Sequence, residues 1–114
     1  MALSGHFAAT SFGVDTHDAT VAETMIVNLK TRKATRSLRM DLGFPEFSKL
    51  VLTTTGAAAA TWRTAGPDVV VVKVDAAGQA VLDRSPGIDP DSLALVGNRI
   101  YWTRDGLPQT AVLN

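Results

Sequence analysis

The fold of this chain can be predicted from residues 47–84, which read FSKLVLTTTGAAAATWRTAGPDVVVVKVDAAGQAVLDR. Four short segments of this stretch are apolar or alternate between apolar and polar residues, and turn residues such as Gly and Pro separate them. They cover residues 49–54, 57–63, 68–75 and 79–84. Short segments bounded in this way are typical of β-strands. The stretch therefore predicts a four-stranded antiparallel meander.

The sequence on both sides of this meander repeats its pattern. A leucine, a short gap, a glycine, several mostly apolar residues and a threonine recur in residues 2–10, 50–61 and 93–103. The three glycines are Gly5, Gly56 and Gly97, and their spacing fits the roughly 40–50 residues of one propeller blade. Each lies where two antiparallel strands need a tight turn with positive φ, which glycine adopts without steric cost.

We therefore predict one all-β domain, residues 1–114, built from about three four-stranded antiparallel blades of a β-propeller. The blades cover about 2–40, 47–84 and 92–113, and the last lacks its outer strand. The strands expected in the first blade are 2–4, 6–12, 24–30 and 34–40, and those in the last are 93–97, 99–104 and 109–113. Residues 57–60 and 69–72 are apolar at consecutive positions, so we expect both faces of those strands to be buried.

Two segments also fit a helix. Thr20-Val21-Ala22-Glu23 has the form of a capping box, and Val21, Met25 and Leu29 are four residues apart, so a helix over about 20–31 is locally reasonable. Asp89 and Pro90 similarly fit the start of a helix around 92–96. We predict strands at both places, because the corresponding residues 69–72 are all β-branched and residues 50–55 also fit a strand.

The segments SLALVGNRIYWTRDG and DAAGQAVLD, with their partner copies, support a family-level comparison. They resemble blades of bacterial β-propellers of the quinoprotein-like and Tol-associated kind, particularly the C-terminal propeller portion of large exported actinobacterial-type proteins. The resemblance covers nearly the whole chain. It implies a half-propeller architecture and an exported parent protein, and it transfers no functional residue, because ligands of such folds are held by divergent loops.

Composition narrows the range of partners. The chain has 114 residues, 46% of them apolar and 19% charged, with a formal net charge of zero. Zero net charge gives no long-range attraction to nucleic acid or to an anionic membrane, so neither is expected as a partner. The absence of cysteine excludes disulfides and a thiol nucleophile within the chain. The first ten residues, MALSGHFAAT, do not form a signal peptide, so the localisation stays open.

Residues 13–22, GVDTHDATVA, are predicted to form a polar loop that is longer than its counterparts in the other copies. Asp15, His17 and Asp18 bring two carboxylates and one imidazole within four residues, and such groups bind cations. The sequence therefore offers these three residues as a candidate metal site. A solvated loop is the favoured interpretation of these residues, because their spacing matches no established calcium or zinc motif.

Two further groups of residues have a functional and a structural interpretation. Five cations could bind phosphate, or could protect the outer strand from pairing with another chain; they are Lys30, Arg32, Lys33, Arg36 and Arg39. Trp62 and Trp102 occupy similar places near the ends of second strands. We expect both to pack between blades.

The sequence contains no established catalytic motif, no nucleotide-binding loop and no cofactor signature. His6 and His17 are its only imidazoles, and His6 lies beside an apolar strand, where a structural role is expected. We predict a non-enzymatic propeller scaffold that mediates self-association or protein binding, with no cofactor. The alternative is a ligand- or cation-binding propeller, enzymatic or not, that uses the 13–22 loop.

Three blades cannot close a ring, because closed propellers have typically four to eight. An isolated arc would expose an apolar blade face at each end. We therefore expect a homodimer in which two chains join head to tail in a six-bladed ring.

Overall fold

The structure is a computed structural model that describes residues 2–15, 20–41, 46–64 and 66–114; for residues 2, 10–15, 20–24, 37–41 and 46–47 it describes the backbone alone. The described residues form eleven β-strands and no helix. The strands are β1 (Ala2–Ser4), β2 (Phe7–Asp15), β3 (Thr20–Asn28), β4 (Lys33–Asp41), β5 (Glu46–Leu52), β6 (Ala58–Arg63), β7 (Val69–Asp75), β8 (Gly78–Ser85), β9 (Ala94–Val96), β10 (Arg99–Arg104) and β11 (Leu107–Val112).

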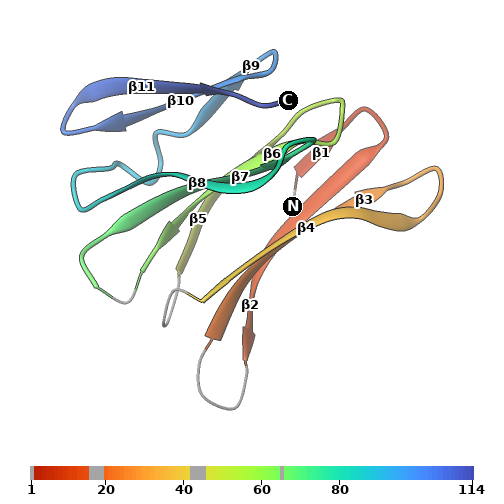
Figure 1. The fold of residues 1–114 in the computed structure, drawn as a ribbon, viewed down its shortest axis with the longest axis horizontal. Coiled ribbons are helices and arrows are strands. Elements are labelled where there is room, and N and C mark those ends of the chain that lie inside the picture. The colour runs from red at the N-terminus through yellow and green to blue at the C-terminus, as the bar shows by residue number, and fades with distance from the viewer. Residues whose placement is uncertain (1, 16–19, 42–45, 65) are drawn as a thin grey trace.

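These strands form three antiparallel sheets in which each strand pairs with its neighbour in the sequence. The first sheet has the order β1-β2-β3-β4, the middle sheet β5-β6-β7-β8, and the last sheet β9-β10-β11. The predicted all-β class is confirmed, as are sheets of four, four and three strands. Figure 1 shows the middle sheet between the other two, in the order of the chain.

The three repeated glycines lie in the turns that join the first and second strands of each sheet. Their φ angles are 58° at Gly5, 83° at Gly56 and 62° at Gly97, all in the region that favours glycine. The prediction of positive φ is therefore confirmed at each turn. Each sheet therefore begins with a hairpin whose turn contains a glycine with positive φ.

Burial of the middle sheet on both faces is the main feature of the core. Successive side chains of a strand point to opposite faces, so β6 contributes alternately to two apolar clusters. Ala58, Ala60 and Trp62 pack in a cluster with Ala9 and Ile26 of the first sheet. The other cluster joins the middle and last sheets, and its members are Ala57, Ala59, Val69, Val71, Ile88, Leu93, Ile100, Trp102 and Leu113.

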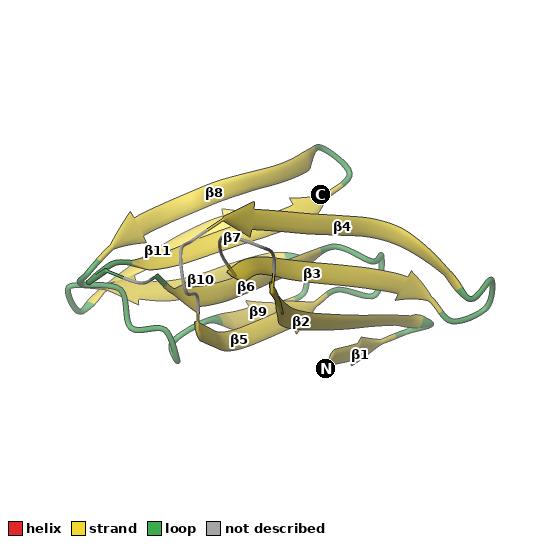
Figure 2. Cartoon of the chain, turned by 90° about the horizontal axis from the view of Figure 1, so that it is seen from below, coloured by secondary structure: helices red, strands yellow, loops and turns green. Residues whose placement is uncertain are grey.

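Both tryptophans therefore pack between sheets, as predicted. Trp62 is 1% exposed in the first cluster and Trp102 is 4% exposed in the second. The fourth strand β8 is mostly exposed, in agreement with its expected outer position. Figure 2 shows β4 and β8 along one edge of the molecule, with β1 and β5 toward the opposite edge.

The predicted loop over residues 13–22 is wrong at both ends. β2 continues through Asp15 and β3 begins at Thr20, and residues 13–15 pair with residues 20–22. Pairing of the two strands satisfies the backbone groups of these polar residues, and residue propensity alone does not predict such pairing.

β3 excludes the helix considered over 20–31, because it pairs with β2 on one side and with β4 on the other. The second helix is also absent, because Asp89 closes a short turn instead. Its carboxylate accepts the N–H of Asp91 (3.0 Å) and its carbonyl accepts the N–H of Ser92 (3.1 Å).

The connection before β9 contributes more to the fold than its Gly and Pro content suggested. Ile88 forms an isolated bridge with Arg104 and is only 3% exposed. The N–H of Asp89 donates to the carbonyl of Thr103 (3.1 Å), and the N–H of Asp105 donates to that of Gly87 (2.9 Å). This segment therefore extends the last sheet beside β10.

In the part of the chain that the structure describes, no helix has the length and apolar character needed to cross a membrane.

Gly56 should tolerate substitution less well than Gly97. An added Cβ would be strained by positive φ at both residues, at roughly 1–2 kcal/mol. At Gly56 it would also come within 2.8 Å of the Phe7 ring, whereas at Gly97 it meets no atom within 4 Å. We expect Gly56→Ala to lower the free energy of unfolding by about 1–3 kcal/mol more than Gly97→Ala, as measured by chemical denaturation. Equal losses of unfolding free energy in the two variants would show that a Cβ at residue 56 does not clash with the Phe7 ring.

Candidate functional site

The predicted metal site lies largely outside the described residues. Asp15 is the last residue of β2, where its backbone pairs with Thr20, and nothing is described of its side chain. His17 and Asp18 lie outside the described residues. Among the residues that are described, no group of His, Asp or Glu could hold a metal ion and no pocket is found.

The basic cluster lies at and beside the hairpin between β3 and β4. Lys30, Arg32 and Lys33 are exposed, and Arg36 is half-buried. One guanidinium N–H of Arg36 donates to the carbonyl of Gly56 (2.9 Å), so this cation links the first sheet to the middle sheet. The side chain of Arg39 is not described. β4 lies at the edge of its sheet, where charged residues discourage pairing with another chain.

His6 is an exposed residue of the turn between β1 and β2. Its ring lies 5.0 Å from the ring of Phe7, measured between centroids. Its backbone carbonyl accepts the N–H of Leu29 (2.7 Å). These contacts agree with the structural role expected for this residue.

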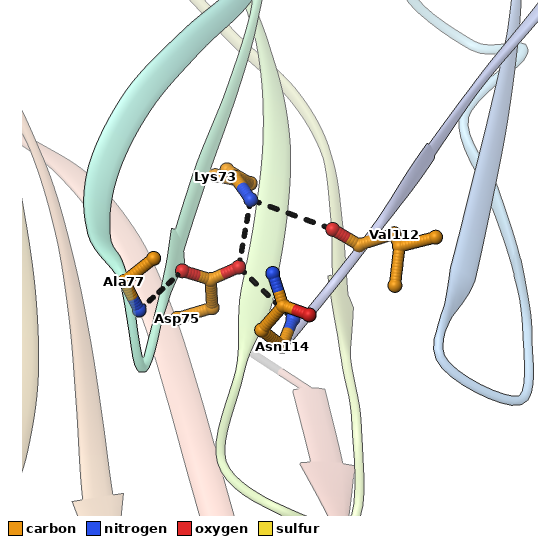
Figure 3. Close-up of polar contacts among 5 residues, drawn as sticks. All are labelled: Lys73, Asp75, Ala77, Val112 and Asn114. Carbon is orange, nitrogen blue, oxygen red and sulfur yellow. Dashed lines mark hydrogen bonds and ion pairs between the residues drawn. The ribbon is translucent and has the colours of Figure 1, made fainter.

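Asp75 is a buried carboxylate that joins the middle and last sheets (Figure 3). It accepts hydrogen bonds from Lys73 Nζ (2.8 Å), from the N–H of Ala77 (2.9 Å) and from the N–H of Asn114 (3.0 Å). Lys73 Nζ also donates to the carbonyl of Val112 (3.4 Å). The carboxylate therefore holds the residues that follow β11 against the end of β7.

Burial alone would raise the pKa of Asp75, because it penalises the charged carboxylate. The hydrogen bonds from Lys73, Asn114 and Ala77 and the charge of Lys73 together outweigh burial, so the pKa lies below its ordinary value. The carboxylate is thus charged at neutral pH and fully bonded. Its role is structural, because both of its oxygen atoms accept hydrogen bonds from groups of the chain itself.

Asp83 makes a second polar link between the middle and last sheets. Its carboxylate accepts the indole N–H of Trp102 (3.0 Å) and a guanidinium N–H of Arg104 (3.1 Å). Thr61 adds a third link, since its buried hydroxyl donates to the carbonyl of Pro90 (2.7 Å). Sequence analysis identified none of these links, because each joins residues 19 or more positions apart.

The outward face of the last sheet exposes apolar residues from all three of its strands. Ile100 and Trp102 point toward the middle sheet, so their neighbours on β10 point away from it. Strand pairing aligns exposed residues of β9, β10 and β11 in two rows across the sheet. We define the outward face of the last sheet by these rows, which are Ala94–Tyr101–Thr110 and Val96–Arg99–Val112.

The first sheet has a corresponding outward row. Ala9 and Ile26 point toward the middle sheet, so Ala8 and the residues paired with it point away. Cross-strand pairing aligns Leu3, Ala8, Val27 and Ala34 in one row, which we call the outward row of the first sheet. Leu3 is 67% exposed and Ala34 is exposed, Val27 is half-buried and Ala8 is 9% exposed, and the row contains no charged residue. Thus each end sheet presents apolar side chains that its single neighbour does not cover.

Comparison of the chain with protein-family models, with curated proteins and with solved structures gave no match.

Asp75→Asn should destabilise the fold at neutral pH and much less in acid. A group whose pKa is lowered by folding stabilises the native state above its unfolded pKa, and loses that contribution as pH falls through the folded pKa. Removal of one partner of a buried ion pair costs roughly 3–5 kcal/mol. We expect a loss near the lower end of this range at pH 7, measured by urea denaturation, and a difference from the unsubstituted chain that shrinks below about pH 4.

Asp91→Asn is the control for this measurement, because Asp91 is exposed. It should change the free energy of unfolding by less than about 0.5 kcal/mol. If the loss of unfolding free energy in Asp75→Asn stayed the same in acid, the stabilising role of the charged Asp75 carboxylate would be contradicted.

Proposed function

We propose that the chain is a non-catalytic scaffold that acts by binding protein, including further copies of itself, through the exposed faces of its end sheets. In this proposal the three sheets are blades of a half-propeller. The observation that carries it is the difference between the sheets: strands β6 and β7 of the middle sheet are buried on both faces, whereas each end sheet has one face that no other described sheet covers.

The uncovered faces have the composition of an interface. Val96 is 67% exposed, and Tyr101 and Val112 are each 38% exposed on the outward face of the last sheet. Contiguous apolar side chains that remain in water usually mark a binding surface or lead to aggregation. Each Å² of apolar surface removed from water contributes roughly 25 cal/mol, so covering two such faces per chain favours a stable complex.

The arrangement of the strands supports a propeller rather than a sandwich. Each sheet is a simple meander, and β5 contacts both β1 and β9, the first strands of the neighbouring sheets. First strands that lie together and fourth strands that lie at the opposite edge are typical of blades around an axis. Two chains of three sheets would supply a ring of six.

We expect an obligate homodimer in solution. Because the folded monomer would expose both end faces, dissociation and unfolding should occur together, and the thermal midpoint should rise with protein concentration. Light scattering at several concentrations in the micromolar range measures the mass, and calorimetry measures the midpoint. A stable folded monomer with a constant midpoint would overturn self-association.

A lysine on an end face should weaken the complex. Val96→Lys places a charge on the outward face of the last sheet and should raise the dissociation constant by roughly tenfold or more, which corresponds to about 1.4 kcal/mol. The matched control is Val81→Lys, because Val81 is 51% exposed on β8 of the middle sheet, away from the two end faces. Sedimentation velocity compares the two variants. Equal effects would show that the last sheet does not bind the partner.

A further inference from the structure

We propose that the two chains join through unlike faces: the outward row of the first sheet in one copy packs on the outward face of the last sheet in the other. Two such junctions would close the ring. This inference rests on the self-association proposed above, and it specifies which surfaces meet.

The first argument is a similarity between two rows of side chains. The face of the middle sheet that packs on the first sheet carries Leu50, Ala60 and Val72 in one row across its first three strands. Val81 continues this row on β8, where it is 51% exposed. The outward row of the first sheet carries Leu, Ala, Val and Ala on the corresponding strands. The first sheet therefore presents outward the same kind of surface that the middle sheet buries against its predecessor.

The second argument is the direction of each contact within the chain. The first sheet meets the middle sheet through the face that bears Phe7, Ala9 and Ile26, and leaves its outward row uncovered. The last sheet meets the middle sheet through Ile100 and Trp102, and leaves the face of Tyr101 uncovered. In both contacts, a sheet packs its one face on the opposite face of the sheet that precedes it in the chain. A contact between the last sheet of one copy and the first sheet of another continues this series.

The turns before the second strands support the same direction. A Cβ at Gly5 would lie 3.5 Å from the carbonyl oxygen of Thr54, so the turn of the first sheet touches the turn of the middle sheet. Gly97 lies in the equivalent turn of the last sheet, and a Cβ there meets nothing within 4 Å. Within the chain, Thr54 of the next sheet lies beside Gly5, whereas no described residue lies in the corresponding place beside Gly97. The turn around Gly5 of a second copy would fill it.

Pairing of like faces is less favourable on electrostatic grounds. The outward face of the last sheet carries the exposed Arg99 between Val96 and Val112. Stacking this face on itself would bring the Arg99 side chains of both copies into one interface, and like charges in an interface oppose binding. Stacking it on the uncharged outward row of the first sheet avoids this repulsion.

The junction can be tested with introduced cysteines, because the chain has none of its own. Leu3 on β1 and Val96 on β9 are each 67% exposed, and both belong to first strands, which contact one another between neighbouring sheets. Because an obligate dimer does not exchange chains while folded, the Leu3→Cys and Val96→Cys chains are unfolded and refolded together. We expect this mixture to form a covalent dimer with a short bis-maleimide linker. Each variant alone should remain uncoupled. Val81→Cys mixed with Leu3→Cys is the control and should also remain uncoupled.

A chain that carries both Leu3→Cys and Val96→Cys tests ring closure. Two copies joined at both junctions should run as one covalent dimer, without a ladder of longer products. A ladder, or a covalent trimer, would overturn closure by two copies. Light scattering and circular dichroism on each variant before coupling establish that it is folded and associated.

The outcomes separate this inference from the proposed function. Associated chains that couple through Leu3→Cys alone, or through Val96→Cys alone, would refute the junction of unlike faces and leave self-association standing. Folded chains that are monomeric and never couple would overturn both. Associated chains that show no coupling in the mixture would also refute the junction, because Leu3 and Val96 would then lie apart.

Discussion

The structure depends on burial of the middle sheet from both sides. Ala57–Ala60 in and before β6, and the valines at the start of β7, send successive side chains into two different apolar clusters. Such strands cannot lie at a surface, so the first and last sheets must cover them. The small size of alanine permits close approach of the sheets, and Trp62 and Trp102 are buried in one cluster each.

Polar links then fix the position of the last sheet on the middle sheet. Apolar packing is not directional, and a short three-stranded sheet could slide over the valines of β7. Asp75, Asp83 and Thr61 prevent this movement, since each bonds a group on the other side of the interface at a defined place. Each buried polar atom in these links is paired, which avoids the cost of an unsatisfied group.

Sequence reasoning recovered the parts of the fold that depend on local chemistry. Gly5, Gly56 and Gly97 identified the turn between the first two strands of each sheet, and the runs of alanine and valine identified strands covered on both faces. It failed where distant pairing decides the outcome, as in the hairpin around Asp15 and Thr20 and at Ile88, whose partner is Arg104. The outward faces could not be predicted either, because strand register determines which residues share a face. Neither the repeat nor the composition identifies the partners of Asp75.

Alternation of the strands in the middle sheet also limits how this sequence can change length. Insertion of one residue into β6 would exchange the contents of the two clusters beyond that point, because every later side chain would turn to the other face. Trp62 would then turn to the face on which Thr61 now bonds the carbonyl of Pro90, and Thr61 would take the place of Trp62 among the valines and Ile26. In a sheet with one face in water, such a shift exposes apolar groups but leaves room for them. Here neither face has room, so insertions and deletions should be confined to the turns between strands.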